Sequence, residues 1–136
     1  MFSRLLTPQQ QRRRLLRRVD DGPLKEYLEV PLPSRRSNIL DCEFLALDFE
    51  TTGLDPRREA ILSIGYTLLQ RGRILMRSNA HHIVMVNKSI PEESVVVHKI
   101  TDDRARSGSH LHDVLPLLLR QMAGRVLLVH YGAIER

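Results

Sequence analysis

Apolar residues fall in short runs along this chain, and the runs alternate between two spacings. Four runs rich in β-branched and aliphatic residues are typical of buried strands. They cover residues 43–49, 60–70, 73–86 and 126–129. Between the third and fourth, apolar residues recur at helical spacing over 111–122, and Gly124 follows just past the end. The pattern therefore predicts three consecutive strands, a helix and a fourth strand.

This order of elements predicts an α/β fold with a mixed sheet. Arg71-Gly72 forms a tight turn between the second and third strands, which favours a hairpin. The helix over 111–122 carries the chain back, so that the last strand can run parallel to a neighbour. A helix start is also predicted at Thr101-Asp102-Asp103.

The first 40 residues have a different character. Thr7 as N-cap, Pro8 in the first turn and Gln10 three residues after the cap predict a helix there, and a second short helix is expected over 23–28. A Pro/Ser/Arg-rich passage over 30–37 is typical of a linker. We therefore expect two regions, a basic helical extension with its linker over 1–40 and a compact domain over 41–136.

Charge separates the same two regions. The 136 residues carry a formal net charge of +5. Residues 1–40 hold nine Lys and Arg against four Asp and Glu, whereas residues 41–136 hold twelve of each. A helix bearing Arg12-Arg13-Arg14 and Arg17-Arg18 can neutralise phosphates, but a solvated helix face or a segment that docks on a polymerase or another protein fits equally well. A transit peptide is disfavoured because the segment is poor in Ser.

Composition excludes several classes of protein. Hydrophobic residues make up 42% of the chain and charged residues 27%, as in globular proteins, and no run approaches the ~20 apolar residues that cross a bilayer. The single cysteine, Cys42, cannot form an internal disulfide, which favours a reducing compartment, and we expect the cytoplasm. Gly-x-Gly-x-x-Gly, Walker and nucleophilic-serine motifs are absent.

Candidate chemistry lies at the end of the first strand. Because side chains alternate along a strand, Asp48 and Glu50 share one face and leave the strand together. Two carboxylates so close repel each other, and a divalent cation removes the conflict. Oxygen ligands of this kind suit Mg²⁺ or Mn²⁺. The alternative is that Glu50 faces solvent and Asp48 caps the following loop.

The residues around this pair carry a family resemblance. Asp48-Phe49-Glu50-Thr51-Thr52-Gly53-Leu54 resembles the first motif of the DEDD family of 3′→5′ exonucleases, Asp-x-Glu-Thr-Thr-Gly-Leu. His98-Lys99-Ile100-Thr101 resembles the His-Gly-Ile-Thr segment of the DEDDh subgroup, which includes the proofreading epsilon subunit of bacterial DNA polymerase III and RNase T. Residues 128–135 resemble its second motif, His-Asn-Ala-x-Phe-Asp.

The resemblance implies a fold and a set of roles. The fold is RNase H-like, with a mixed five-stranded sheet that is C-terminally incomplete here. Two Mg²⁺ or Mn²⁺ ions are the implied cofactors, and the implied catalytic and metal-binding residues are Asp48, Glu50 and Glu135. The residues implied to bind the terminal nucleotide are Thr51, Thr52, Gly53, Leu54, His98, Ile100, Thr101 and His130.

Three departures limit what the resemblance implies for this sequence. Glu135 stands where the family has Asp, and Lys99 replaces a Gly, which matters if that position needs a positive φ. The third motif, a His or Tyr followed by an Asp, is not among the 136 residues, so we also expect a core face to be left uncovered.

The expected function is therefore a metal-dependent 3′→5′ exonuclease domain acting on single-stranded DNA or RNA 3′ ends, with little activity in these 136 residues alone. One alternative is a non-catalytic exonuclease-like fragment that binds nucleic acid or a partner. Another is an oligoribonuclease or RNase T-like exoribonuclease.

Overall fold

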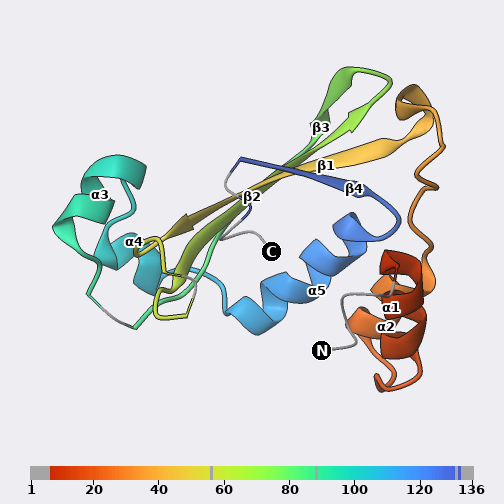
Figure 1. The fold of residues 1–136 in the computed structure, drawn as a ribbon. Coiled ribbons are helices and arrows are strands. Elements are labelled where there is room, and N and C mark those ends of the chain that lie inside the picture. Colours follow the sequence, from red (N-terminus) through yellow and green to blue (C-terminus); the bar gives the residue numbers. More distant parts are fainter. Residues whose placement is uncertain (1–6, 56, 88, 131, 133–136) are drawn as a thin grey trace.

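The mixed sheet is the centre of the fold. The computed structural model describes residues 7–55, 57–87, 89–130 and 132. Its four strands are β1 (Glu43–Thr51), β2 (Ile61–Gln70), β3 (Arg73–Ile83) and β4 (Val126–Val129). They lie in the order β3-β2-β1-β4 (Figure 1), with β1, β2 and β3 antiparallel and β4 parallel to β1. This confirms the predicted α/β fold and its mixed sheet, and the described residues supply four of the five strands that the resemblance implies.

The third strand is shorter than its apolar run predicts. Ser109 donates its N–H to Ile83 O and accepts the N–H of Met85, at 2.9 and 2.8 Å. The chain at 83–85 is therefore hydrogen-bonded both to β2 and to the segment just before the helix over 111–122. The turn before β3 matches its prediction, because Arg71 and Gly72 have φ of 50° and 70°, the positive pair of a two-residue hairpin.

One face of the sheet packs on helix α5 (Leu111–Met122), which lies beneath it in Figure 1. Leu45 and Leu47 of β1 and Ile64 of β2 meet Val114 and Leu118 of α5 in the main core. The opposite face of β4 presents exposed apolar side chains, those of Val126 and Leu128. No described helix is long and apolar enough to span a membrane.

Of the N-terminal helices, α2 (Pro23–Glu29) packs on α5 and α1 (Pro8–Leu16) packs on α2. Helix α1 begins as predicted, with Thr7 and Gln10 forming a reciprocal capping box. Helix α2 contacts α5, and Val30 just after it lies against Gly124, which has a φ of 71°. The described part of the N-terminal region thus contacts the sheet domain through α2 and Val30, and a domain boundary at residue 40 stays a prediction.

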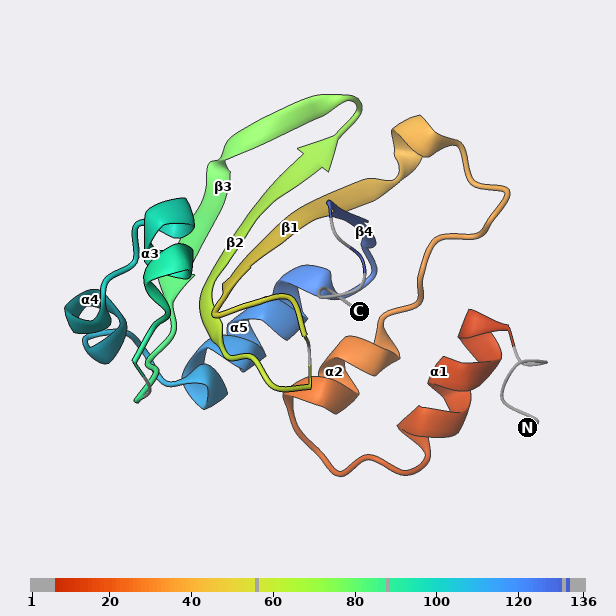
Figure 2. The ribbon, with the colours of Figure 1, turned by 60° about the vertical axis from the view of Figure 1, so that its left-hand side comes forward.

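Two short helices, α3 (Glu92–His98) and α4 (Asp102–Arg106), lie at the other end of the sheet from α1 and α2 (Figures 1 and 2). They enclose a second core of Leu62, Val86, Ile90, Ile100 and Ala105. A 3₁₀ turn, η2 (Ile39–Asp41), leads into β1. The sequence predicted the start of α4 but neither α3 nor η2.

Candidate active site

The two carboxylates near the C-terminal end of β1 lie as the alternation predicts. Leu45 and Leu47 are buried against α5, whereas Asp48 is exposed and Glu50 is half-buried on the other face. Neither carboxylate forms a hydrogen bond or an ion pair with another described residue. Two acidic groups without partners therefore leave the strand on one side.

The turn after β1 is held by its threonines. The strand register shifts between Glu50 and Thr51, and the Thr51 hydroxyl donates to Gly53 O at 2.6 Å. Thr52 donates its N–H to Ala60 O, accepts the N–H of Ala60 on its hydroxyl at 3.0 Å, and donates that hydroxyl to Glu59. These bonds fix the backbone beside the carboxylates.

Gly53 lies in close contact with the side chain of Glu59. A Cβ at this position would lie 2.9 Å from Cδ of Glu59, inside normal contact distance. The Glu59 carboxylate accepts a hydrogen bond from the Thr52 hydroxyl. A larger residue at position 53 would therefore displace the Glu59 side chain. The glycine of the motif thus serves the packing of the turn on the loop that returns to β2.

Helix α3 is joined to this turn. The Ser94 hydroxyl donates to Thr52 O at 2.9 Å, which fixes α3 against the first motif. At the end of α3, Nδ1 of His98 accepts the N–H of Ile100 at 3.2 Å. In the neutral ring the proton therefore lies on Nε2. That Nε2 is buried and has no partner among the described residues.

The backbone conformation of Lys99 shows whether this position of the motif needs a positive φ. It ends α3 with φ 56° and ψ 26°, in the left-handed region, and its N–H donates to Val95 O at 2.8 Å. This position does need a positive φ, which glycine adopts without steric cost.

These elements surround a cavity of about 670 Å³. Its lining residues come from the end of β1, the turn, α3 and the residue after β4. They are Asp48, Phe49, Glu50, Thr51, Gly53, Leu54, Glu93, Ser94, Val97, His98 and His130. Seven predicted site residues therefore share one cavity, namely Asp48, Glu50, Thr51, Gly53, Leu54, His98 and His130.

His130 reaches this cavity through the pairing of two strands. Leu47 of β1 pairs with Val129 of β4 in parallel, so the next residues, Asp48 and His130, lie level with each other. Leu54 lies at the rim with 73% of its surface exposed. An apolar side chain so exposed is available to a ligand.

The structure does not bring every predicted site residue to the cavity wall. Ile100 is 2% exposed and packs in the second core, and the Thr101 hydroxyl caps α4 by accepting the N–H of Arg104. The hydroxyl of Thr52 points to the loop at 59–60. Glu135 lies outside the described residues. The nucleotide contacts of the first three, metal binding by Glu135 and the roles of the seven cavity residues all stay predictions.

Four lining residues were missed by the sequence analysis, namely Phe49 of β1 and three residues of α3. Glu93, Ser94 and Val97 line the cavity from α3, and with His98 they follow the spacing of one helix face. Their common face can be seen only once α3 is known, because the sequence analysis did not predict this helix.

The described residues hold no group of three or more His, Cys, Asp or Glu side chains arranged to bind a metal. Asp48 and Glu50 supply two carboxylates to the cavity. A third ligand therefore has to come from outside this set.

Comparison with known proteins agrees with this geometry. The family model RNase_T, described as Exonuclease, matches residues 45–134. The chain belongs to this exonuclease family. The match covers β1 to the end of β4 and leaves α1 and α2 outside it. The first motif and the DEDD resemblance are thereby confirmed at the level of the family.

Relatives of known sequence include parts of replicative polymerases. The chain is 31% identical over 90 residues to the PolC-type DNA polymerase III of Thermotoga maritima, covering 66% of this chain and 6% of that protein. It is 29% identical over 87 residues to the DNA polymerase III epsilon subunit of Treponema pallidum, covering 64% and 40%. The chain therefore spans less than half the length of either relative.

Solved structures show the same fold. Exonuclease X in complex with 5′ overhanging duplex DNA matches with a TM-score of 0.57 at 22% identity, over 68% of this chain and 51% of that one. Exonuclease I from Methylocaldum szegediense matches with a TM-score of 0.60 at 16% identity, over 67% and 21%. The α/β fold is thus the RNase H-like fold of these exonucleases.

Proposed function

We propose that this chain forms the catalytic-site half of a metal-dependent 3′→5′ exonuclease that removes nucleotides from single-stranded DNA, as an epsilon-like domain. The observation that carries the proposal is the cavity at the end of β1. It gathers Asp48, Glu50, the Thr51–Leu54 turn, His98 and His130 from three separate segments of the chain. DNA is favoured over RNA because the relatives of known sequence are DNA polymerase III proteins.

The acidic pair fits divalent metal ions. Asp48 and Glu50 line the same cavity, have no hydrogen-bond or ion-pair partner among the described residues, and offer only oxygen donors. This donor set suits Mg²⁺ or Mn²⁺, with Glu135 as the further ligand that the family motif supplies. When bound, such ions activate water for attack on the phosphodiester and offset the charge that develops on its oxygens.

The other side chains bind and orient the substrate. Leu54 offers an exposed apolar surface to the terminal base, and the turn held by Thr51 keeps that surface beside the carboxylates. His98 offers Nε2–H as a fixed donor to an oxygen of the terminal nucleotide, because Ile100 occupies its other nitrogen. His130, level with Asp48, closes the cavity on the β4 side.

The proton acceptor is the part of the reaction that these residues do not supply. In the family it is the His or Tyr of the third motif, which the 136 residues do not contain. Loss of a general base typically lowers the rate by about 10²–10⁴-fold. The 136-residue polypeptide is therefore expected to cleave DNA near the background rate, and a polypeptide that carries a third motif is expected to cleave it efficiently.

Metal binding tests the site without requiring activity. Calorimetry with Mn²⁺ on the 136-residue chain is expected to show binding that Asp48→Asn or Glu50→Gln weakens at least tenfold. Glu92→Gln is the matched control, because Glu92 is an exposed acid of α3 that does not line the cavity. Equal affinity in Glu50→Gln and Glu92→Gln would refute the placement.

The reaction itself is tested on a 5′-labelled single strand with a polypeptide that includes the third motif. We expect stepwise shortening from the 3′ end that needs added Mg²⁺ or Mn²⁺ and is lost in Asp48→Asn. Shortening from the 5′ end, or hydrolysis that survives both EDTA and Asp48→Asn, would overturn the proposal.

A further inference from the structure

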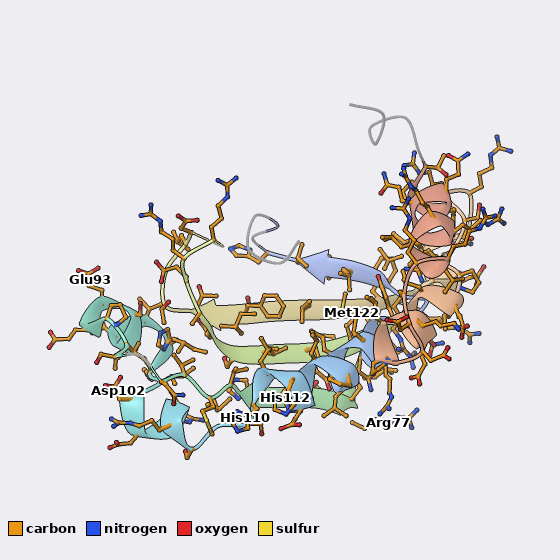
Figure 3. All side chains as sticks on the ribbon, turned by 90° about the horizontal axis from the view of Figure 1, so that it is seen from below. Arg77, Glu93, Asp102, His110, His112 and Met122 are labelled. Carbon is orange, nitrogen blue, oxygen red and sulfur yellow. The ribbon has the colours of Figure 1, made fainter. Side chains whose placement is uncertain are left out.

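The arginines of the first helix divide between two sides. Arg12 is buried with 8% of its surface exposed, whereas Arg13, Arg14, Arg17 and Arg18 are exposed. At about 100° per residue Arg13 and Arg14 lie on the sides of α1 away from Arg12, and Arg17 and Arg18 follow in the turn at its C-terminal end. Figure 3 shows side chains with nitrogen tips extending outward from α1.

Arg12 anchors the helix that displays them. Its Nη2 donates to Tyr27 O and Val30 O, both at 2.7 Å, and its guanidinium lies 4.7 Å from the centre of the Tyr27 ring. These contacts join α1 to the last turn of α2, which itself contacts α5. The exposed arginines thus lie on a helix, and on the turn at its C-terminal end, that are attached to the folded domain.

The exposed arginines have no acidic partner in the part of the chain that the structure describes. The ion pairs of this region join Lys25 to Asp21 and Arg120 to Glu26, and neither involves the outer face of α1. Arg35 and Arg36, in the segment after α2, are exposed and equally unpaired among these residues. The region keeps its excess positive charge on the surface.

The chemistry of this surface favours phosphate. Guanidinium groups bind phosphate oxygens through two parallel hydrogen bonds, and four of them within six residues offer several phosphate sites close together. A membrane-binding helix needs a broad apolar face. Helix α1 has only Leu15 and Leu16 as apolar residues within Pro8–Leu16, which disfavours a lipid surface.

We propose that Arg13, Arg14, Arg17 and Arg18, named here the arginine face, bind the sugar-phosphate backbone of the nucleic acid whose 3′ end enters the cavity. The inference rests on the proposed function, and it assigns a role to a segment that lies outside the residues matched by the exonuclease family model.

The position of α1 sets the length of nucleic acid required. Val30, just after α2, lies against Gly124, and the next residue, Arg125, donates its guanidinium to Glu43 at the start of β1 at 2.9 Å. The cavity lies at the other end of β1. Residues 43 to 50 of an extended strand span about 25 Å. About seven stacked nucleotides cover that distance. Oligonucleotides shorter than this reach only one of the two surfaces.

The test measures binding of single-stranded DNA to the 136-residue chain in EDTA by fluorescence anisotropy over a range of salt concentrations. An oligonucleotide of about 20 nucleotides is expected to bind more tightly than one of about 4. Each lost phosphate contact lowers the slope of log K against log salt by about 0.7 on a single strand. Arg13→Gln/Arg17→Gln is therefore expected to lower the slope for the long strand by about 1.4, and the variant with all four arginines replaced by about 2.8 in total.

The matched control removes the same charge elsewhere. Arg77→Gln/Arg104→Gln replaces two exposed arginines, on β3 and α4, that also lack an ion pair with a described residue. The inference is overturned if this control lowers the slope as much as Arg13→Gln/Arg17→Gln does. It is also overturned if the variants leave DNA binding unchanged and lose binding to anionic phospholipid vesicles or to an acidic protein instead.

The two proposals fail in different ways. Absence of metal-dependent 3′ shortening with retained arginine-dependent binding overturns the proposed activity and keeps a nucleic-acid-binding surface. Normal shortening with binding that is indifferent to the arginine face overturns this inference alone. Thermal unfolding of the variants is expected to match that of the parent chain, because the four side chains are exposed.

Discussion

Replacement of Lys99 by glycine is expected to stabilise the protein. Lys99 ends α3 with φ 56° and ψ 26°, where the Cβ of an L-residue crowds the backbone at a cost of roughly 1–2 kcal/mol. Its side chain is exposed and forms no hydrogen bond or ion pair with a described residue, so the substitution removes no contact from this part of the chain. Glycine loses about 0.5–1 kcal/mol through its more flexible unfolded state. The net expectation is a gain of about 1 kcal/mol in the free energy of unfolding.

Urea denaturation measures this gain. Lys99→Gly is expected to raise the midpoint without changing the slope of the transition, because the folded contacts stay the same. Lys99→Ala is the control, since it removes the charge and keeps the Cβ, and we expect its stability to lie within about 0.5 kcal/mol of the parent. A glycine variant no more stable than the alanine variant would show that the left-handed backbone carries no strain here.

Two further substitutions test other contacts of the structure. Arg12→Gln removes the donor of two short hydrogen bonds to carbonyls at the end of α2, and we expect it to lower the free energy of unfolding by about 2–4 kcal/mol in urea denaturation. The control, Arg13→Gln on the exposed side, is expected to change the free energy of unfolding by less than about 0.5 kcal/mol. His98→Phe keeps a ring and removes the Nε2 donor, so we expect calorimetry to show about tenfold weaker binding of a nucleoside 5′-monophosphate in Mn²⁺. The control is His112→Phe, on the exposed start of α5, for which we expect no change in affinity. Equal losses in both variants would contradict the role given to Nε2.

Elements with a strong local pattern were predictable from the sequence. The helix over 111–122 and the strand over 126–129 have the bounds that the apolar spacing predicts. The capping box of Thr7 and Gln10 is likewise a local feature, because both bonds join residues three apart. Such elements need no knowledge of the rest of the fold.

Helix α3 was missed because its residues favour another structure. Val95, Val96 and Val97 are β-branched and would be expected in a strand. Val97 is 79% exposed, so no buried apolar face indicates the helix either. The bond from Ser94 to Thr52, across 42 positions, helps to hold α3 in place, and a contact between such distant residues cannot be seen in a local pattern.

Charge alone could not divide the arginines of α1. Sequence spacing places Arg12 on the opposite side from its neighbours, but only the packing of α1 on α2 shows which side is buried. A buried guanidinium is tolerated because two backbone carbonyls and the Tyr27 ring replace water around it.

The candidate site depends on both kinds of information. Asp48, Glu50 and the following turn form one continuous segment, which is why the first motif is recognisable in the sequence. His130 lies beside Asp48 only because β4 pairs with β1 in the register of Leu47 and Val129. A slip of one residue in that pairing would turn the apolar side chains of β4 away from α5, where Leu127 and Val129 now pack. The core contacts that bury β4 therefore also fix the position of His130, so the position of this side of the site follows from the hydrophobic packing of the sheet on α5.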